Sequence, residues 1–302
     1  IVNNGGNPDI LELVATWGSQ QQYRYFLREF GIAHGRLVSR FPKRWARKVW
    51  DAFGGKNDLE KKRLEELLIH LQSTMVKREG TAWDDNQTAW LDNAVRENTR
   101  YPFQAILARD NPGNRPEIIV EEALNSSTCP QWETPHSRIV PRTAEAMATA
   151  VASMLACCRW VRFIDPYISS CKKQHLRSME AFFKILVDKR PVGPANQIEV
   201  HTKAEGASRD FLLKFYRQIA PAGLQITMYL WRERANGQRL HNRYILTDLG
   251  GVSFQHGLDC GRDGETDDLA RLDSDQYSIR CEQYRPETQA FEAAGAPIEI
   301  RV

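Results

Sequence analysis

The feature that most constrains the fold is an alternation of helix-like and strand-like segments between residues 143 and 231. Thr143 can cap an Ala-rich helix that extends to Cys158, and Val161–Ile164 then has the composition of a strand that ends at Asp165. A helix, a strand, a helix and a strand are predicted next, over residues 174–188, 198–202, 208–219 and 225–231. This order is typical of an α/β fold whose mixed, mostly parallel sheet is flanked by helices.

Residues 1–100 have a different character and indicate a helical region. Asn57 and Glu60 have the spacing of a capping box, and Gly80 is a candidate for the end of that helix. A second helix is predicted near residues 88–96, and a strand over residues 117–121. We therefore predict a helical N-terminal region over residues 1–100 and an α/β domain over residues 102–302.

Composition bounds the class of protein. Of 302 residues, 42% are hydrophobic and 26% are charged, which is ordinary for a globular chain, and the net charge of +3 is too small to require a nucleic-acid partner. The six cysteines include no Cys-x-x-Cys pair, so we expect neither a zinc site nor a disulfide scaffold, but reduced thiols in the cytoplasm. The most apolar stretch, residues 146–158, is too short to span a bilayer, and the start of the chain does not have the pattern of a signal peptide, so we expect no membrane partner.

A short motif near residue 241 carries the strongest chemical signal. On a strand, His241 and Arg243 would project from the same side, Asp248 would lie just beyond the strand end, and Gly250-Gly251 would form a turn to a second strand. A guanidinium group can hold two phosphate oxygens, an imidazole can attack phosphorus, and a carboxylate can orient that imidazole. The alternative is a half-buried strand histidine beside an ordinary surface arginine. His175 and His201 are also followed by a base two residues later, but neither has an aspartate seven residues later.

With this spacing, the chain resembles the phospholipase D superfamily, whose signature is His-x-Lys, four residues, Asp, six residues and Gly-Ser-x-x-Asn. His241, Arg243 and Asp248 match the first three positions, with arginine in place of lysine. Gln255 and His256 stand where Gly-Ser is expected, and Asp259 stands where Asn is expected. The segment 161–168 resembles the early core strand of that fold, and the resemblance covers about residues 102–302.

The resemblance implies a metal-independent phosphodiesterase with no cofactor, and specifically a nuclease that acts through a phosphohistidine. His241 would be the nucleophile, Arg243 would bind nonbridging oxygens, and Asp248 would orient or support the region near His241. Because only one copy of the motif is evident, the resemblance also implies a homodimer. His256 is a candidate acid, or simply an exposed histidine. Because ligands of such sheets lie beyond the carboxyl ends of strands, Asp165 and His201 are expected near the site, with capping as the alternative role of Asp165.

Other classes of function remain open because the motif is incomplete. Arg243 and Asp259 depart from the family, and an acidic stretch over residues 263–275 would repel a phosphate unless it folds away, engages arginines such as Arg232, Arg234 or Arg239, or meets a basic partner. The nuclease could serve in a bacterial antiviral defence or restriction system. A catalytically decayed module that binds nucleic acid or a regulatory protein is the main alternative. A phospholipase or phosphatidyl transferase is the weakest, since no amphipathic lipid-facing segment stands out.

A basic run precedes these features in the N-terminal region. Pro42 suits the first turn of a helix and Gly54-Gly55 its end, with Trp45 and Val49 on one face. Such a helix could bind a nucleic-acid backbone, with DNA favoured over RNA, or it could be a solvated face or a docking surface for an acidic partner. The basic residues are Arg36, Arg40, Lys43, Arg44, Arg47 and Lys48.

Overall fold

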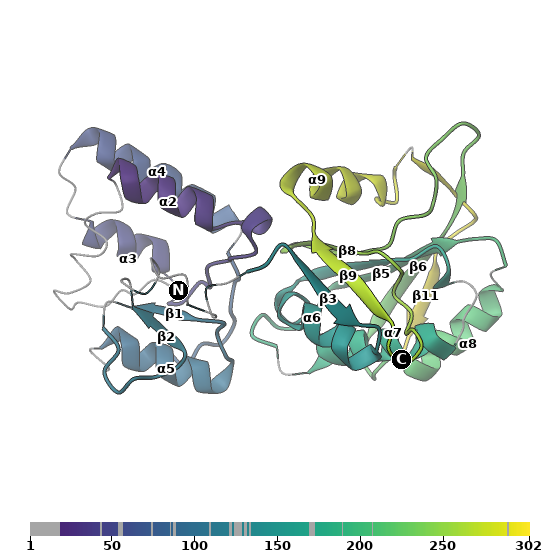
Figure 1. The fold of residues 1–302 in the computed structure, drawn as a ribbon, viewed down its shortest axis with the longest axis horizontal. Coiled ribbons are helices and arrows are strands. Elements are labelled where there is room, and N and C mark those ends of the chain that lie inside the picture. Colours follow the sequence, from purple (N-terminus) through teal and green to yellow (C-terminus); the bar gives the residue numbers. More distant parts are fainter. Residues whose placement is uncertain are drawn as a thin grey trace. The chain divides into compact units, whose positions relative to one another are not determined.

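The computed structural model describes residues 19–302, except 43, 54–56, 74, 85, 87–88, 109, 121–122, 124–128, 130–131, 133, 169–172, 189, 207 and 289. The chain divides into two compact units, residues 1–135 and residues 136–302, and each is described by itself (Figure 1). The boundary lies later in the chain than the predicted one near residue 101. Residues 106–108 and 118–120 pair as strands and contribute to the hydrophobic core of the first unit, which is why they belong to it.

Unit 1 is mainly helical. Its described elements are α2 (Gln20–Glu29), the 3-10 turn η1 (Ile32–His34), α3 (Trp45–Ala52), α4 (Asp58–Ser73), α5 (Trp90–Arg100), and the parallel strands β1 (Ile106–Ala108) and β2 (Ile118–Val120). Asn57 caps α4 as predicted, because its Oδ1 accepts a hydrogen bond of 2.8 Å from the backbone N–H of Glu60. The helix ends at Ser73, so the prediction that Gly80 ends it was wrong.

The core of unit 1 forms where α3 packs on α4. Trp45 and Val49 are fully buried one turn apart, and they pack with Leu64 and Leu67 of α4. The predicted inward face of the basic helix is therefore confirmed, although α3 begins at Trp45 and Pro42 precedes it. Burial of these large side chains stabilises the unit by about 1.5–3 kcal/mol for each of them.

Unit 2 is built on one mixed sheet. Within the described residues nine strands form it, in the order β10-β6-β5-β4-β7-β8-β9-β3, with β11 also paired to β6. The strands are β3 (Ser137–Pro141), β4 (Trp160–Ile164), β5 (Gln197–Lys203), β6 (Gln225–Glu233), β7 (Tyr244–Thr247), β8 (Gly250–Phe254), β9 (Thr266–Arg271), β10 (Phe291–Ala293) and β11 (Ile298–Arg301). The α/β class predicted from the alternation is confirmed.

The prediction that the sheet is mostly parallel was wrong. Only the β4–β5 and β5–β6 pairs are parallel, and every other described pair in this sheet is antiparallel. The parallel pairs are those joined by helices long enough to cross the sheet, because a parallel connection needs a dozen or more residues. From β7 onward the connections are short or carry α9 (Ser274–Gln283) along the opposite face, so the strands reverse direction.

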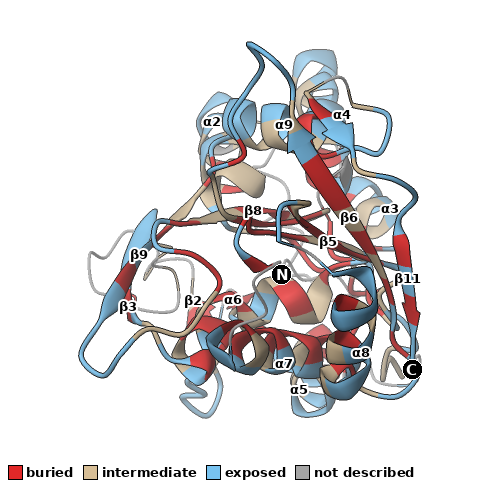
Figure 2. Cartoon of the chain, turned by 90° about the vertical axis from the view of Figure 1, so that its right-hand side faces the viewer, coloured by how far each residue is buried: buried red, intermediate tan, exposed pale blue. Residues whose placement is uncertain are grey.

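Helices cover both faces of the sheet. On one face lie α6 (Ala144–Cys157), α7 (Lys173–Val187) and α8 (Arg209–Ile219), which share a core cluster with β4, β5 and β6. On the other face α9 covers a second, smaller cluster (Figure 1). The central strands are accordingly the most buried part of this unit (Figure 2). Thr143 caps α6 as predicted, accepting a hydrogen bond of 3.1 Å from Ala146 N. None of the helices described in either unit is long and apolar enough to cross a bilayer.

The β7–β8 hairpin differs in detail from its prediction. His241 and Arg243 precede β7 instead of lying within it, and the turn is formed by Asp248 and Leu249, whereas Gly250 and Gly251 belong to β8. Gly251 is required there by packing, because a Cβ at this position would lie 2.7 Å from Cδ2 of Leu246 and 2.8 Å from Cδ1 of Leu272. Gly251 therefore admits neighbouring side chains, and neither glycine makes the turn.

Candidate functional site at the carboxyl end of β4

The site is centred on Asp165, which directly follows β4. Its side chain is 1% exposed, and both oxygens accept backbone hydrogen bonds of 2.8 Å, Oδ1 from Tyr167 N and Oδ2 from Leu258 N. The first bond closes a turn, as expected for a capping aspartate. The second ties the segment after β8 to the end of β4. Asp165 therefore caps a turn and also lies at the carboxyl end of a parallel strand, where ligands of such sheets bind.

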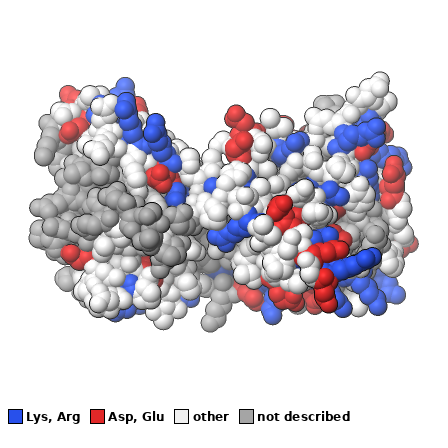
Figure 3. All heavy atoms as spheres, viewed as in Figure 1, with Lys and Arg blue, Asp and Glu red and all other residues white. Residues whose placement is uncertain are grey.

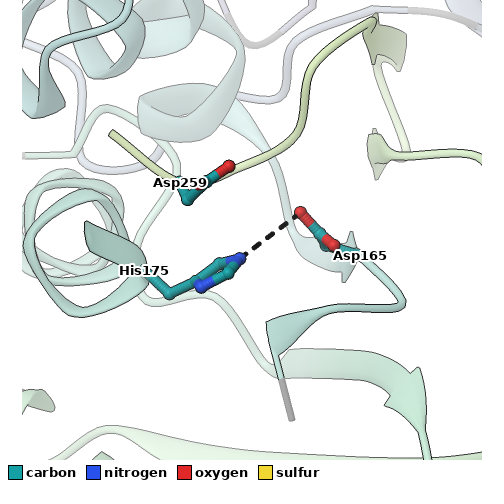
Figure 4. Close-up of side chains that lie close together, drawn as sticks. All are labelled: Asp165, His175 and Asp259. Carbon is teal, nitrogen blue, oxygen red and sulfur yellow. Dashed lines mark ion pairs between the residues drawn. The ribbon is translucent and has the colours of Figure 1, made fainter. Parts of the chain in front are cut away.

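His175 approaches Asp165 from the first turn of α7. Its Nε2 lies 3.8 Å from Oδ2 of Asp165, and the side chain is almost fully buried (Figure 4). Neither ring nitrogen has a hydrogen-bond partner among the residues that the structure describes. Buried polar atoms nearly always have a partner, so this imidazole is an exception that needs a reason.

Arg243 reaches the same place from the start of β7. The antiparallel register pairs Ile164 with Tyr244, so Asp165 and Arg243 are the next residues beyond that pair. The guanidinium carbon lies 5.0 Å from the centre of the Tyr167 ring, and Nη1 donates a hydrogen bond of 3.3 Å to the carbonyl of Gln255. Its Nε is buried without a partner among the described residues. A cation with an unused donor thus borders the carboxylates.

Gly257 allows these groups to gather. A Cβ at this position would lie 3.0 Å from Oδ2 of Asp165, 3.0 Å from Oδ1 of Asp259 and 3.8 Å from Nε of Arg243. Its φ of +124° is also a conformation that favours glycine. A side chain here would separate the carboxylates and close the space between them, so the absence of a side chain is part of the site.

Asp259 is partly neutralised by an arginine from the β3–α6 connection. Nη2 of Arg142 donates to Oδ1 of Asp259 at 2.7 Å, and its Nη1 lies 3.3 Å from Oε2 of Glu265. Arg142 therefore pairs with Glu265 of the acidic stretch over residues 263–275. Sequence reasoning did not single out Arg142. Much of that stretch is not a solvated loop, since residues 266–271 form β9.

The two histidines of the motif flank the β7–β8 hairpin, since His241 precedes β7 and His256 follows β8. The ladder extends one step past Tyr244 and Ser253, because Phe254 N donates to the carbonyl of Arg243. His256 follows β8 and pairs with Asp267, with 3.2 Å between Nδ1 and Oδ1, while its side chain is 53% exposed. His241 is exposed, and within the described part of the chain no hydrogen bond or ion pair links it to Arg243, His256 or Asp259.

Asp248 lies at the other end of β7, which corrects its expected role. The four residues of β7 lie between it and Arg243, so the two are five steps, or about 16 Å, apart at a rise of about 3.3 Å per residue. Its Oδ1 accepts from the backbone N–H of Arg159 at 2.7 Å, and its Oδ2 from Nε of Arg159 at 3.0 Å. Asp248 thus fixes the beginning of β4, and it does not orient His241.

The opposite face of the sheet holds a buried polar network around His201. Its Nδ1 accepts from Nε1 of Trp231 at 3.0 Å, which leaves Nε2 to donate to Oε2 of Glu199 at 3.1 Å. Oε2 of Glu199 also accepts from Nε of Arg162 at 2.6 Å. Burial lowers the pKa of His201, although Glu199 opposes this shift. Burial raises the pKa of Glu199, but His201 and Arg162 together lower it below its ordinary value. The side chain of His201 therefore points away from the candidate site, although its backbone carbonyl accepts a hydrogen bond of 3.1 Å from Asp165 N.

The predicted basic group belongs to unit 1, and part of it is structural. Arg36 pairs with Glu29 at 2.9 Å and donates to the carbonyl of Trp132, and its guanidinium lies 4.5 Å from the centre of that ring. Arg40 is half-buried, and Lys43 is outside the described residues. Lys48 lies 4.8 Å from the centre of the Trp83 ring.

Two residues of the group, Arg44 and Arg47, remain exposed, and Arg47 lies 3.6 Å from Asp51. Exposed Arg24 and Arg28 lie one turn apart on α2 and were missed, because they precede the basic run. Figure 3 shows a run of basic side chains with acidic ones beside it over the part of unit 1 that holds α2 and α4, and both signs of charge are also present over the visible face of unit 2.

Sequence reasoning identified Arg243, His256 and Asp259 of this site, but it missed Arg142 and His175. His175 was set aside because no aspartate follows it seven residues later. A usable signal was its place near the start of the helix that follows the β4 strand, since such positions border the carboxyl end of the strand.

Comparison with known proteins does not assign the chain to a family. No family model matches it, and no curated protein matches it. Among solved structures, an archaeal chromatin protein, TrmBL2, whose structure shows a novel mode of DNA binding, is 8% identical over 50% of this chain and 51% of its own, with a TM-score of 0.26. A likeness this weak carries no argument about fold or function.

Proposed function

We propose that unit 2 is a phosphodiesterase that acts on nucleic acid, with His241 as the nucleophile and no metal required for bond cleavage. One observation carries the proposal. His241 and Arg243 precede β7, and His256 and Asp259 follow β8, so the antiparallel pairing of these strands puts both segments toward one end of the hairpin, beside the carboxyl end of β4. A nucleophile, a phosphate-binding cation and a candidate acid therefore share one edge of the sheet.

The reaction would proceed in two steps. A nitrogen of His241 attacks phosphorus while the bond to the leaving oxygen breaks, and an acid gives that oxygen its proton. Water then hydrolyses the phosphohistidine and restores the imidazole. The acid is His256 of the same chain, or His241 of a second copy if the protein forms the homodimer that the single motif implies. Arg243 would hold the nonbridging oxygens.

The decisive experiment measures cleavage of single- and double-stranded DNA and RNA in excess EDTA. Wild-type protein and His136→Ala should cleave, and His241→Ala should not, since His136 is an exposed histidine beside β3 that lies outside this edge. His256→Ala should lower the rate by about 100-fold if His256 is the acid. Equal cleavage by His241→Ala, or cleavage that requires an added metal ion, would contradict the proposed mechanism.

A binding module without catalysis is the second candidate. Asp165 and Asp259 border Arg243, and carboxylates beside a guanidinium group disfavour a phosphate there. In that case wild type would not cleave any of the four substrates but would retain binding that weakens as salt rises. The exposed Arg24, Arg28, Arg44 and Arg47 of unit 1 are the basic residues to replace in such a binding assay.

A further inference from the structure

We propose that Asp165, His175 and Asp259 form a binding site for one divalent metal ion. The three residues come from the end of β4, the first turn of α7 and the segment between β8 and β9. The inference does not depend on His241, and it assigns the ion no part in the proposed cleavage. The ion would join the segment between β8 and β9 to the region between β4 and α7, which is more than 80 residues earlier in the sequence.

The ligand atoms are close enough for one ion to bind them after a small adjustment. One nitrogen of His175 and one oxygen from each carboxylate lie within 4.8 Å of one another (Figure 4). Bonds of about 2.1 Å place two ligand atoms on one ion at most about 4.2 Å apart. The 3.8 Å between His175 and Asp165 already meets that limit. Asp259, whose side chain is 28% exposed, is the ligand free to close the remaining distance.

His175 supplies an independent indication of a ligand. Its side chain is 3% exposed and is directed toward the two carboxylates, yet both ring nitrogens lack a hydrogen bond within the described part of the chain. The fully paired His201 shows what a structural buried histidine looks like in this same unit. A metal ion would satisfy one nitrogen of His175 by direct coordination.

The surroundings hold the carboxylates in place for an ion. Asp165 is oriented by the backbone N–H groups of Tyr167 and Leu258, which leaves Oδ2 a second lone pair directed away from the Leu258 bond. Arg142 orients Asp259 through Oδ1 and leaves its Oδ2 without a hydrogen bond among the described residues. Such outer hydrogen bonds commonly fix metal ligands and tune their affinity. Gly257 leaves open the space in which the carboxylate oxygens meet.

The ligand set indicates the class of ion. Two carboxylates and one imidazole suit a first-row ion such as Mn²⁺, with water completing its coordination, better than Ca²⁺, which takes six to eight oxygens. The neighbouring positive charges limit the affinity for this ion. Arg142 and Arg243 border the two carboxylates and would lower the affinity for a cation, so we expect moderate binding instead of permanent occupancy.

The test is titration of the full chain with MnCl₂. Binding is measured as the loss of the electron paramagnetic resonance signal of free Mn²⁺. We use Mn²⁺ because soft thiolates select other ions, so the free cysteines compete little for it. Wild-type protein should bind one ion. Asp259→Asn and His175→Gln should each weaken binding by at least about tenfold. Glu265→Gln and His256→Gln replace a neighbouring carboxylate and a neighbouring imidazole outside the cluster, and should stay within about twofold of wild type.

Folding must be checked for each variant, because His175 is buried. Asp259→Asn is on the partly exposed ligand and keeps the proposal testable if His175→Gln unfolds. No Mn²⁺ binding by wild type, or equal binding by folded Asp259→Asn, would overturn the site. Cleavage in EDTA does not bear on this result, so the metal site and the phosphodiesterase can each fail while the other stands.

Discussion

Unit 2 contains two buried histidines, one on each face of its sheet, and they differ in what surrounds them. His201 has a partner on each nitrogen, whereas His175 has none on either within the described residues. Both are almost fully buried, so burial alone does not separate them. The difference lies in the completeness of the hydrogen bonding. A completed network stabilises the fold by itself, and an incomplete one leaves room for a ligand.

The largest expected effect comes from breaking the completed network. Glu199→Ala leaves Arg162 and His201 without their shared carboxylate, and we expect the free energy of unfolding in urea to fall by about 3–5 kcal/mol. Glu299→Ala replaces an exposed glutamate on the neighbouring part of the sheet and should cost less than about 0.5 kcal/mol. Similar losses of unfolding free energy in the two variants would mean that the network around His201 adds little to the stability of the fold.

A second prediction adds the ligand that the incomplete network lacks. At a free Mn²⁺ concentration of 100 times its dissociation constant, wild-type protein should gain about 2.7 kcal/mol in unfolding free energy. Asp259→Asn should gain much less at the same concentration. Thermal unfolding with and without MnCl₂ measures both. An identical gain in the two proteins would place the ion elsewhere.

The third prediction compares the histidines directly in EDTA. His201→Leu leaves Nε1 of Trp231 without its acceptor, and should lower the unfolding free energy by about 1–3 kcal/mol. His175→Leu removes two polar atoms that have no described partner, so its unfolding free energy should be nearly unchanged or slightly higher. Urea unfolding of both variants decides this. An equal loss of unfolding free energy in the two variants would mean that His175 and His201 contribute alike to the stability of the fold.

The smallest effect is a pH dependence from His201. Burial holds the pKa of His201 below its ordinary value, so this side chain stays neutral in the folded protein while the unfolded chain takes up a proton below about pH 6.5. The unfolded state then binds more protons, and stability should fall as the pH is lowered from 7.5 to 5.5. His201→Leu should show a shallower fall over the same range. Parallel curves for the two proteins would argue against a lowered pKa of His201.

The sequence allowed the alternating part of unit 2 to be predicted because each helix and strand there carries local signals. Thr143 and Ser208 cap their helices, and the apolar strands between them are parallel. The antiparallel direction of β7 beside β4 was missed, because it depends on the connection and not on composition, and β9 was missed as a strand. Arg243 was found from a local motif. Its place beside Asp165 depends on a strand register that no local pattern records.

The hydrogen bonds between Asp248 and Arg159 have a practical consequence for genetic screens. Its carboxylate anchors the backbone where β4 begins, and Asp165 directly follows the end of β4 at Ile164. An alanine screen scored only on activity would therefore group Asp248 with His241. Growth or assay at reduced temperature separates them, since a folding defect is relieved by cooling and a missing nucleophile is not. Alleles of Asp248 should behave as temperature-sensitive.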